Sequence, residues 1–420
     1  MVLLVLALAV GAAAVTGLFA SMTPTDTAVH APDARTPGTP LVGTLGTRPS
    51  TADREADNGV ALGMVELRWA DWETSPGAWN ESYQRQITDQ IDALHRAGLR
   101  VTLGLGLHYT PSWVRDRPFV DDHGNRSEQA DFVFDARNRA AAEAFIGHAA
   151  TVIDFSRLWA VRISSGSRSE LMYPQGGTWW AFSPGALGTA ARPDTVRANP
   201  FPDWRPGDGD GLSEPDRRRW YQWYLASLAD TARWQMRMAQ AHGFQGWFQV
   251  LTPGSGIRPS VRERIIEQGL PDGLGGEGVD WPEIYRLVAG FGPPGRVVAY
   301  VTSVGDDSGG NSGCQPGDRA VPLDADRADG WSSTRWIARI AAEHGFPVAG
   351  ENPGYTASPE YQRQYRDDSD DGLLATTFRL AQECSFQSVY WAHDDQLWNG
   401  TVDRGQFFDL VRALPPEPTS

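Results

Sequence analysis

The apolar run 158-LWAVRIS-164 is followed almost at once by 166-GSRSELMYP-174. A short apolar run of this kind is typical of a buried strand. The Tyr173–Pro174 pair does not easily continue a regular element. Glu170 therefore lies just past the end of a predicted strand. It is either an ordinary surface acid on a loop or a catalytic group held at the strand end, and the fold decides between the two.

The same kind of run recurs along the chain. Further runs occupy 41–46, 60–69, 99–109, 246–253, 296–304, 346–352 and 386–393, and stretches with helical spacing lie at 81–98, 137–153, 218–242, 331–345, 371–383 and 404–412. Strands that alternate with helices indicate a parallel sheet, and a count of eight favours closure. We predict a single (β/α)8 TIM barrel, with a doubly wound open sheet as the alternative. The segment 47–59 shows little helical pattern.

Two residues are predicted to set the ends of the helix over 81–98. Asn80 precedes it and has a side chain suited to capping the first turn. Gly98 follows it and is suited to the left-handed conformation that stops a helix. Gly243 and Gly345 close the helices over 218–242 and 331–345 in the same way.

Composition limits the classes of function. The 420 residues fit one barrel with insertions. The formal net charge is −15, which disfavours binding to nucleic acid or to an anionic membrane surface. All 37 basic residues are Arg, so mechanisms that need a lysine nucleophile or Schiff base are excluded.

In a barrel of this kind, active sites are built at the carboxyl ends of the strands. The polar and aromatic residues at the predicted ends are Glu66, Arg68, Asp71, His108, Tyr109, Glu170, Gln249, Ser303, Asp306, Asp307, Glu351, Asn352, Trp391, His393, Asp394, Asp395 and Trp398. The sequence has no convincing phosphate-binding loop, nucleotide fingerprint or metal-spaced cluster. We therefore expect no cofactor and no metal, although His108, Asp394 and Asp395 have the chemistry to bind a cation.

Glu170 and Glu351 are the predicted catalytic pair. Each lies at or just beyond the end of an apolar strand, where a charged residue has no packing reason to be. Glycoside hydrolysis needs two carboxyl groups, one to protonate the leaving oxygen and one to attack the anomeric carbon or activate a water. The alternative is that both are solvated loop acids.

The chain holds 17 Trp, and flat aromatic faces pack against sugar rings. The predicted substrate-binding residues are Glu66, Arg68, His108, Tyr109, Tyr173, Trp179, Trp180, Gln249, Asn352, Trp391, Asp394 and Trp398. Glu66 and Arg68 share one face of their strand and are equally suited to an interior ion pair. Trp391 and Trp398 are either sugar platforms or core residues, and we favour Trp391 as a platform.

A long segment with little regular pattern follows Glu170. It covers 171–219 and holds Tyr173, Trp179 and Trp180 among Gly, Pro and Asp. Structureless loops of this length are usually functional or disordered, and the aromatic content argues against disorder. We predict an insertion after the fourth strand that forms a lid or a wall over the sugar site. An Ω-like loop packed for stability alone is the alternative.

Two motifs carry a family resemblance. The stretch 166-GSRSELMYP-174 resembles the segment around the catalytic acid of β-amylases, family 14 of the glycoside hydrolases, and 348-VAGENPGY-355 resembles the segment around their catalytic base. The stretches 72-WETSPGAWNESY-83 and 97-AGLRVTLGLGLHYTPSWV-114 resemble family 42 β-galactosidases and other clan A glycosidases. The resemblance implies a barrel in which Glu170 is the general acid and Glu351 the base or nucleophile. It fixes neither the sugar nor the stereochemical outcome.

The two terminal segments differ in composition from the predicted barrel. Residues 1–20 are almost wholly apolar and indicate a signal peptide or an N-terminal membrane anchor, and 21–40 look like a disordered spacer. The predicted barrel covers 41–413, and 414–420 form a disordered tail. Cys314 and Cys384 form a disulfide if the protein is exported, or remain free.

These features predict a bacterial glycoside hydrolase, secreted or anchored at the cell surface, that acts on an oligo- or polysaccharide. The first alternative is a non-catalytic carbohydrate-binding barrel at the cell surface. The second is another barrel enzyme, such as a lyase or a transglycosylase.

Overall fold

The computed structural model describes residues 39–207, 211–290, 295–354 and 359–415. The predicted signal peptide or anchor, nearly all of the predicted spacer and most of the predicted tail lie outside these residues. Within the described residues, no helix is long and apolar enough to span a membrane.

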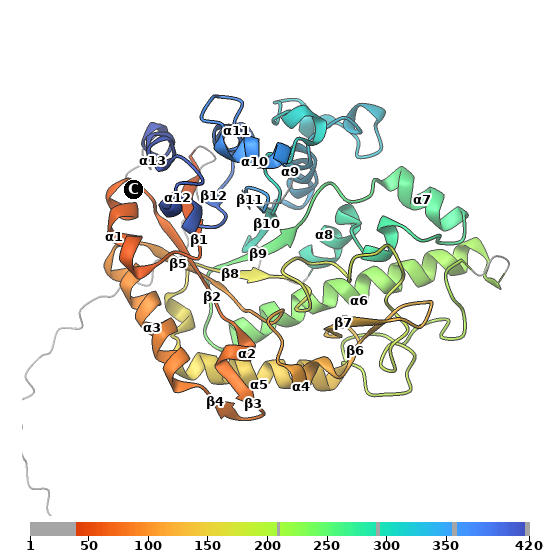
Figure 1. Ribbon diagram of the computed structural model, residues 1–420. Coiled ribbons are helices and arrows are strands. Elements are labelled where there is room, and N and C mark those ends of the chain that lie inside the picture. Colours follow the sequence, from red (N-terminus) through yellow and green to blue (C-terminus); the bar gives the residue numbers. More distant parts are fainter. Residues whose placement is uncertain (1–38, 208–210, 291–294, 355–358, 416–420) are drawn as a thin grey trace, which may run out of the picture. The chain divides into compact units, whose positions relative to one another are not determined.

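The eight apolar runs form one closed, all-parallel barrel (Figure 1). The first strand pairs with both the second and the last, which rules out the open sheet. The prediction of a (β/α)8 barrel is therefore confirmed. The strands, in chain order, are β1 (Leu41–Leu45), β2 (Leu62–Glu66), β5 (Arg100–Gly104), β8 (Ala160–Ile163), β9 (Trp247–Thr252), β10 (Val297–Val301), β11 (Val348–Glu351) and β12 (Ser388–Trp391).

A helix follows every strand of the barrel. These helices are α1 (Pro49–Asp57), α3 (Glu81–Arg96), α5 (Ala136–Val152), α6 (Glu214–Ala241), α8 (Trp281–Ala289), α9 (Ser333–His344), α11 (Leu373–Glu383) and α13 (Arg404–Ala413). Asn80 caps α3 by accepting from the Tyr83 N–H, as predicted. Gly345 ends α9 in the left-handed conformation, with φ of 66°.

The prediction of little helix over 47–59 is wrong. Helix α1 occupies this segment, with a proline in its first turn, where the missing N–H has no cost. Its buried residues are Thr51, Ala52 and Glu55, so it presents small and polar side chains to the barrel. The apolar periodicity that marks the other helices is absent for that reason.

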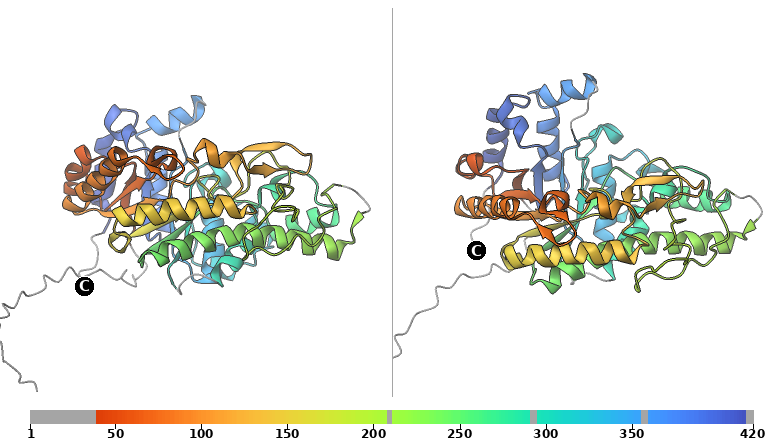
Figure 2. Two further views of the ribbon diagram at one scale, coloured as in Figure 1. Left: turned by 90° about the horizontal axis from the view of Figure 1, so that it is seen from below. Right: turned by 60° about the horizontal axis from the view of Figure 1, so that its bottom comes forward.

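Shorter elements are inserted between strands and helices. They comprise α2 (Trp69–Trp72), β3 (Glu73–Ser75), β4 (Ala78–Trp79), α4 (Ser112–Arg115), β6 (Pro118–Val120), β7 (Arg126–Ala130), α7 (Pro259–Glu267), α10 (Pro359–Arg366), α12 (Asp395–Asn399) and the 3-10 turns η1 (Phe155–Arg157), η3 (Leu274–Glu277), η4 (Ser308–Asn311), η5 (Asp318–Ala320) and η6 (Asp326–Ala328). Helices α5 and α6 lie side by side in all three views (Figures 1 and 2). The β6–β7 hairpin and α7 lie near the N-terminal half of α6 (Figure 1).

Side chains alternate between the two faces of each strand, so the hydrophobic core has an inner layer within the barrel and an outer layer between the strands and the helices. Side chains that point into the barrel include Met64, Trp247, Tyr300 and Tyr390. Their strand neighbours point outward and pack against the helices, because successive side chains face opposite sides of a strand. Trp391, next to Tyr390, belongs to this outer layer and is 1% exposed.

In the segment after Glu170, aromatic side chains from 173–180 pack on α6, which itself begins at Glu214. Tyr173 stacks on Tyr224 at 4.1 Å, and Trp179 meets Trp220 edge to face at 5.5 Å. The Tyr173 hydroxyl donates to the Tyr224 carbonyl, and the Tyr224 hydroxyl accepts from the Trp180 N–H. These aromatic side chains extend the outer layer of the core over α6, a part of it that we call the second core, as in the alternative of a loop packed for stability.

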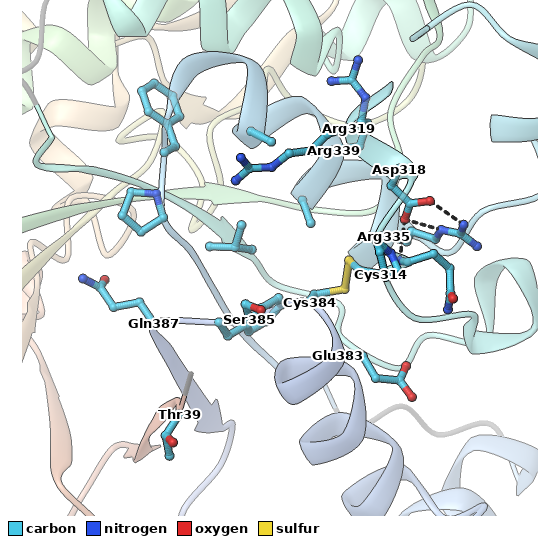
Figure 3. A pocket seen from close by; sticks show the side chains of 18 of the residues that line it. Thr39, Cys314, Asp318, Arg319, Arg335, Arg339, Glu383, Cys384, Ser385 and Gln387 are labelled. Atoms are coloured by element: carbon cyan, nitrogen blue, oxygen red, sulfur yellow. Dashed lines mark hydrogen bonds and ion pairs between the residues drawn. A yellow bond between two sulfur atoms is a disulfide. The ribbon is translucent and has the colours of Figure 1, made fainter. Parts of the chain in front are cut away.

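Cys314 and Cys384 form a disulfide, the first of the two alternatives that the sequence left open. The bond lines a cavity of about 730 Å³ whose other walls include Trp247 and Val348, the first residues of β9 and β11 (Figure 3). Arg335 pairs there with Asp318. This cavity lies at the amino ends of the strands, the end of the barrel opposite to where such folds build active sites.

Candidate active site

A cleft of about 420 Å³ opens at the carboxyl ends of the strands. A pocket of this size suits a small organic ligand or a short stretch of a polymer. Every barrel strand, or the residue directly after it, contributes to the lining: Leu45, Glu66, Gly104, Ser164, Leu251, Thr302, Glu351 and Ala392. Glu170, His108, Tyr109, Arg162 and His393 complete its polar surface.

Glu351 ends β11 and is held by two donors. Arg162 Nη1 donates to Glu351 Oε2 at 2.8 Å, and the Tyr300 hydroxyl donates to the same oxygen at 2.7 Å. Burial alone would lower the pKa of Arg162, but the charge of Glu351 raises it above its usual value, so Arg162 stays protonated. One carboxylate oxygen of Glu351 is therefore fixed in place by a cation and a hydroxyl.

Glu66 ends β2 and shares the cleft with Glu351. Its carboxyl group lies over Gly104 of the neighbouring strand, where a Cβ atom would come within 2.2 Å of Glu66 Oε2. Burial raises the pKa of Glu66 to about 7, and the charge of Glu351 adds to this, while Arg162 and the Gly106 N–H act in the opposite direction. At neutral pH this carboxyl group is thus poised between its two protonation states.

Glu170 reaches the cleft on a short excursion of the chain, which we define as residues 164–170. Strand β8 ends at Ile163, which pairs with Val250 of β9, and the Leu171 N–H then donates to the Leu251 carbonyl. The chain therefore leaves the sheet after Ile163 and rejoins it at Leu171. The side chain of Glu170 accepts from the Ser169 hydroxyl at 2.7 Å.

His108, Tyr109 and Arg68 form the next part of the predicted site. The rings of His108 and Tyr109 lie 4.2 Å apart, and the Arg68 guanidinium lies 4.8 Å from the centre of the Tyr109 ring. Burial, Arg162 and Arg168 lower the pKa of His108 to about 4, so its imidazole is neutral. Arg68 pairs with Asp71 rather than with Glu66, and it does not itself line the cleft.

Two predicted substrate contacts, Gln249 and Asn352, are buried below or beside the cleft and do not line it. Gln249 is fully buried and lies 3.5 Å from the Tyr390 hydroxyl. Asn352 is also fully buried; it accepts from the Ala392 N–H and donates to the Tyr365 hydroxyl. It therefore joins β11 to the segment after β12.

The predicted aromatic and acidic residues at the end of β12 and just after it also lie outside the cleft. Trp391 faces the helix layer because Tyr390 faces the barrel, and it packs against Tyr365. Asp394 is 1% exposed and accepts from Arg48 and from the Trp398 indole. Trp391 is buried and so is not placed to act as a sugar platform, and Trp398 is half-buried and does not line the cleft.

Tyr173, Trp179 and Trp180 do not line the cleft either. They belong to the second core on α6 described above, and Trp180, the most exposed of the three, is 7% exposed. The prediction that they form a lid or wall over a sugar is therefore replaced by a role in stability.

Arg162 and Tyr300 were missed in the sequence. Arg162 is a charged residue in the middle of an apolar strand, and Tyr300 holds the equivalent place in 296-RVVAYVTSV-304. Both occupy inward positions and donate to the same oxygen of Glu351. A charge inside a buried strand is itself a signal, because it needs a partner there.

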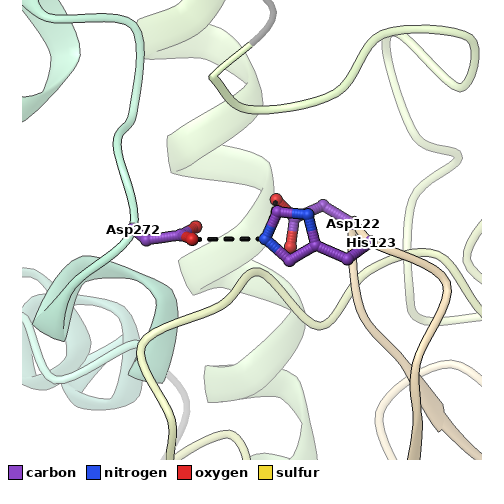
Figure 4. Close-up of side chains that lie close together, drawn as sticks. All are labelled: Asp122, His123 and Asp272. Atoms are coloured by element: carbon purple, nitrogen blue, oxygen red, sulfur yellow. Dashed lines mark hydrogen bonds and ion pairs between the residues drawn. The ribbon is translucent and has the colours of Figure 1, made fainter.

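The three residues named as a cation candidate are not brought together. His108 lines the cleft, Asp394 is buried against Arg48, and Asp395 is exposed. A different group, Asp122, His123 and Asp272, has its potential ligand atoms within 4.8 Å of one another (Figure 4). His123 Nε2 lies 3.2 Å from Asp272 Oδ2 and Asp122 accepts from the Trp179 N–H, so contacts within the protein account for this group.

Solved structures with a similar fold are glycoside hydrolases. The catalytic domain of β-amylase from Paenibacillus polymyxa matches with a TM-score of 0.59 at 13% identity, over 91% of this chain and 100% of that one. A β-galactosidase from the psychrophilic Marinomonas ef1 matches with a TM-score of 0.52 at 12% identity, over 83% of this chain and 53% of that one. No family model and no curated protein matches the sequence.

At this identity the likeness shows the fold. It confirms that the barrel resembles those of a β-amylase and a β-galactosidase, the two kinds of enzyme that the sequence motifs resemble.

Proposed function

We propose that this protein is an exported glycoside hydrolase that cleaves O-glycosidic bonds in an oligo- or polysaccharide with Glu170 and Glu351. The observation that carries the proposal is that both carboxyl groups line one cleft at the carboxyl end of the barrel. They come from the ends of β8 and β11, which are separated by two strands. A carboxyl pair in a shared cleft is the equipment that glycoside hydrolysis requires.

The surroundings assign different roles to the two groups. Glu351 accepts from Arg162 and Tyr300 at one carboxylate oxygen, which leaves its second oxygen for the anomeric carbon or for a water. Glu170 has only the Ser169 hydroxyl as a side-chain partner among the described residues. Its carboxyl group is therefore the freer of the two to turn toward the leaving oxygen, and we assign it the role of general acid.

Export is supported separately. The disulfide between Cys314 and Cys384 is of the kind that persists in oxidising compartments. The apolar segment 1–20 has the composition of a signal peptide or anchor. Fractionation of the source cells, with an antibody against the barrel, tests this part of the proposal; a protein confined to the cytoplasm contradicts it.

The catalytic assignment is tested with Glu170→Gln and Glu351→Gln, assayed separately on a panel of glycosides and polysaccharides. Loss of the proton donor or of the base lowers kcat by about 10²–10⁴-fold. Glu81→Gln is the matched control, since its side chain is 82% exposed on α3. Full activity in both cleft variants would sink the assignment.

Two further readouts complete the test. The anomeric form of the first product, followed by proton NMR, distinguishes retention from inversion. Binding of glycans without any cleavage by the wild type would favour the carbohydrate-binding barrel, and an unsaturated product would favour a lyase.

A further inference from the structure

A side compartment of about 270 Å³ adjoins the cleft. It shares His108 and Ser169 with the cleft, and its own walls include Arg115 from α4, Gln129 from β7, and Ser167 and Arg168 from the excursion 164–170. The inserted hairpin and the excursion thus form it together. The catalytic proposal above makes no use of this compartment.

Polar atoms in its wall have no protein partner. Ser167 is 5% exposed, and its hydroxyl has no hydrogen-bond partner among the described residues. The same holds for Gln129 Oε1 and Arg168 Nε, which are also buried from solvent. Unsatisfied buried polar groups are costly, and three of them belong to residues in the wall of this one space.

The compartment is also positively charged within an acidic protein. The described part of the chain places no carboxylate within ion-pair distance of Arg168 or Arg115, and Glu128 is the one acidic side chain that it contributes to the lining. His108 is neutral at pH 7, as shown above. Two guanidinium groups therefore face one carboxylate here, whereas the whole chain carries a net charge of −15.

The position of Arg168 ties the compartment to the reaction centre. Arg168 lies two residues before Glu170 on the same excursion, and two residues span at most about 7 Å. Its backbone N–H donates to the Ser165 hydroxyl, and the Gly166 N–H donates to the Ser164 hydroxyl, so local bonds hold the excursion. A group bound by Arg168 therefore belongs to the sugar at the scissile bond or to the one beside it.

We propose that this compartment binds an anionic substituent of the substrate, and that Arg168 selects acidic glycans over neutral ones. The inference rests on the proposed glycosidase function and names its substrate class. A carboxylate of a uronic acid and a sulfate ester share the chemistry that a guanidinium recognises through paired N–H donors.

The experiment compares acidic glycans with their neutralised counterparts. Polyuronates are paired with their methyl esters, and sulfated polysaccharides with their desulfated forms. For each pair, the ratio of kcat/KM is measured for the wild type, Arg168→Gln, Arg168→Lys and Arg137→Gln. Arg137 is the matched control, since its side chain is 67% exposed on α5 and outside the compartment.

The expected result is a preference of at least about tenfold for the acidic member of one pair in the wild type, as a charge-assisted contact supplies. It falls to within about twofold in Arg168→Gln, partly survives in Arg168→Lys, and is unchanged in Arg137→Gln. Preference for a polyuronate identifies a carboxylate, and preference for a sulfated glycan identifies a sulfate. The preference also weakens at high salt.

Cleavage without any acidic preference, or a preference that survives Arg168→Gln, overturns the inference and leaves the proposed function standing. If the wild type cleaves no glycan, the proposed function fails instead. Calorimetric titration with the same paired glycans then decides the inference by itself: tighter binding of an acidic member that Arg168→Gln abolishes supports it, and equal binding overturns it. Circular dichroism checks that each variant is folded.

Discussion

Arg162 and Glu351 form an ion pair of 2.8 Å across the barrel mouth, although the two residues come from strands that are not neighbours. The Tyr300 ring lies under the guanidinium, at 5.0 Å from its centre. The pair fixes the predicted base or nucleophile without using an element from outside the barrel.

Replacement of Arg162 tests this arrangement. Arg162→Met removes the cation that faces Glu351, and we expect kcat to fall by about 10²–10³-fold, as when a preorganised electrostatic partner is lost. Loss of one partner of a buried pair also destabilises the fold, by about 3–5 kcal/mol. Arg162→Lys keeps the charge, and we expect it to recover part of the lost kcat and part of the lost stability. Steady-state kinetics and urea unfolding measure the two effects, and unchanged kcat in a folded Arg162→Met variant contradicts the role.

Glu66 predicts a dependence of stability on pH. Its pKa of about 7 in the folded protein exceeds the ordinary value of 4.5, so folding favours the protonated carboxyl group. This contribution is fully present below about pH 4.5 and is lost as the pH rises through 7. Glu66→Gln mimics the protonated group, so we expect the variant to gain about 1–3 kcal/mol on the wild type between these limits.

Glu55 and Asp131 have pKa values raised to about 7 by burial in the same way. Urea unfolding at a series of pH values gives the free energy of unfolding of Glu66→Gln and of the wild type. The difference between the two therefore isolates the contribution of Glu66. A difference that is constant from pH 4.5 to 8 contradicts the prediction.

Trp179 and Tyr109 are expected to respond in opposite ways to truncation. Trp179 is fully buried in the second core, so Trp179→Ala should lower the free energy of unfolding by about 3–5 kcal/mol. Tyr109 is 37% exposed and lines the cleft, so Tyr109→Ala should raise KM with little loss of stability. Thermal melting and kinetics on both variants separate the two roles. A raised KM with unchanged melting for Trp179→Ala would restore it to the substrate site.

The disulfide is expected to stabilise the chain without affecting the cleft. It joins residues that are 70 positions apart, and removal of such a link costs about 2–5 kcal/mol. Cys314→Ser combined with Cys384→Ser should lower the midpoint of urea unfolding and leave KM unchanged at 25 °C. Titration of the unreduced wild type with a thiol reagent should detect no free thiol, and a positive reaction would contradict the bridge.

The strands were predictable because each is a short apolar run bounded by polar or turn residues. Helix α1 was not, because Thr51 and Glu55 fill positions where other helices carry apolar side chains. Part of the site followed from one rule, that polar residues at strand ends gather at the barrel mouth. Glu66, His108 and Tyr109 are placed there for that reason, beside Glu170 and Glu351.

The predictions about Trp391 and Trp179 failed, and Arg162 was missed, because their places depend on strand orientation and on contacts between residues that are distant in sequence. Trp391 is one position away from the inward-facing Tyr390, and a shift of one residue turns a strand side chain to the other face. The burial of Trp179 depends on Trp220 of α6, which is distant in sequence. Arg162 was hidden because its partner lies far along the chain, at Glu351.

The way in which the chain leaves β8 and returns at Leu171 has an evolutionary consequence. The β8–β9 ladder is complete at Ile163 and a single backbone hydrogen bond joins Leu171 to Leu251, so residues can be added to or deleted from 164–170 without shifting the register of any strand. Insertions in such loops cost little free energy compared with changes in a packed element. Selection can therefore retune which glycan fits beside Glu170 while the scaffold that holds Glu351 stays untouched.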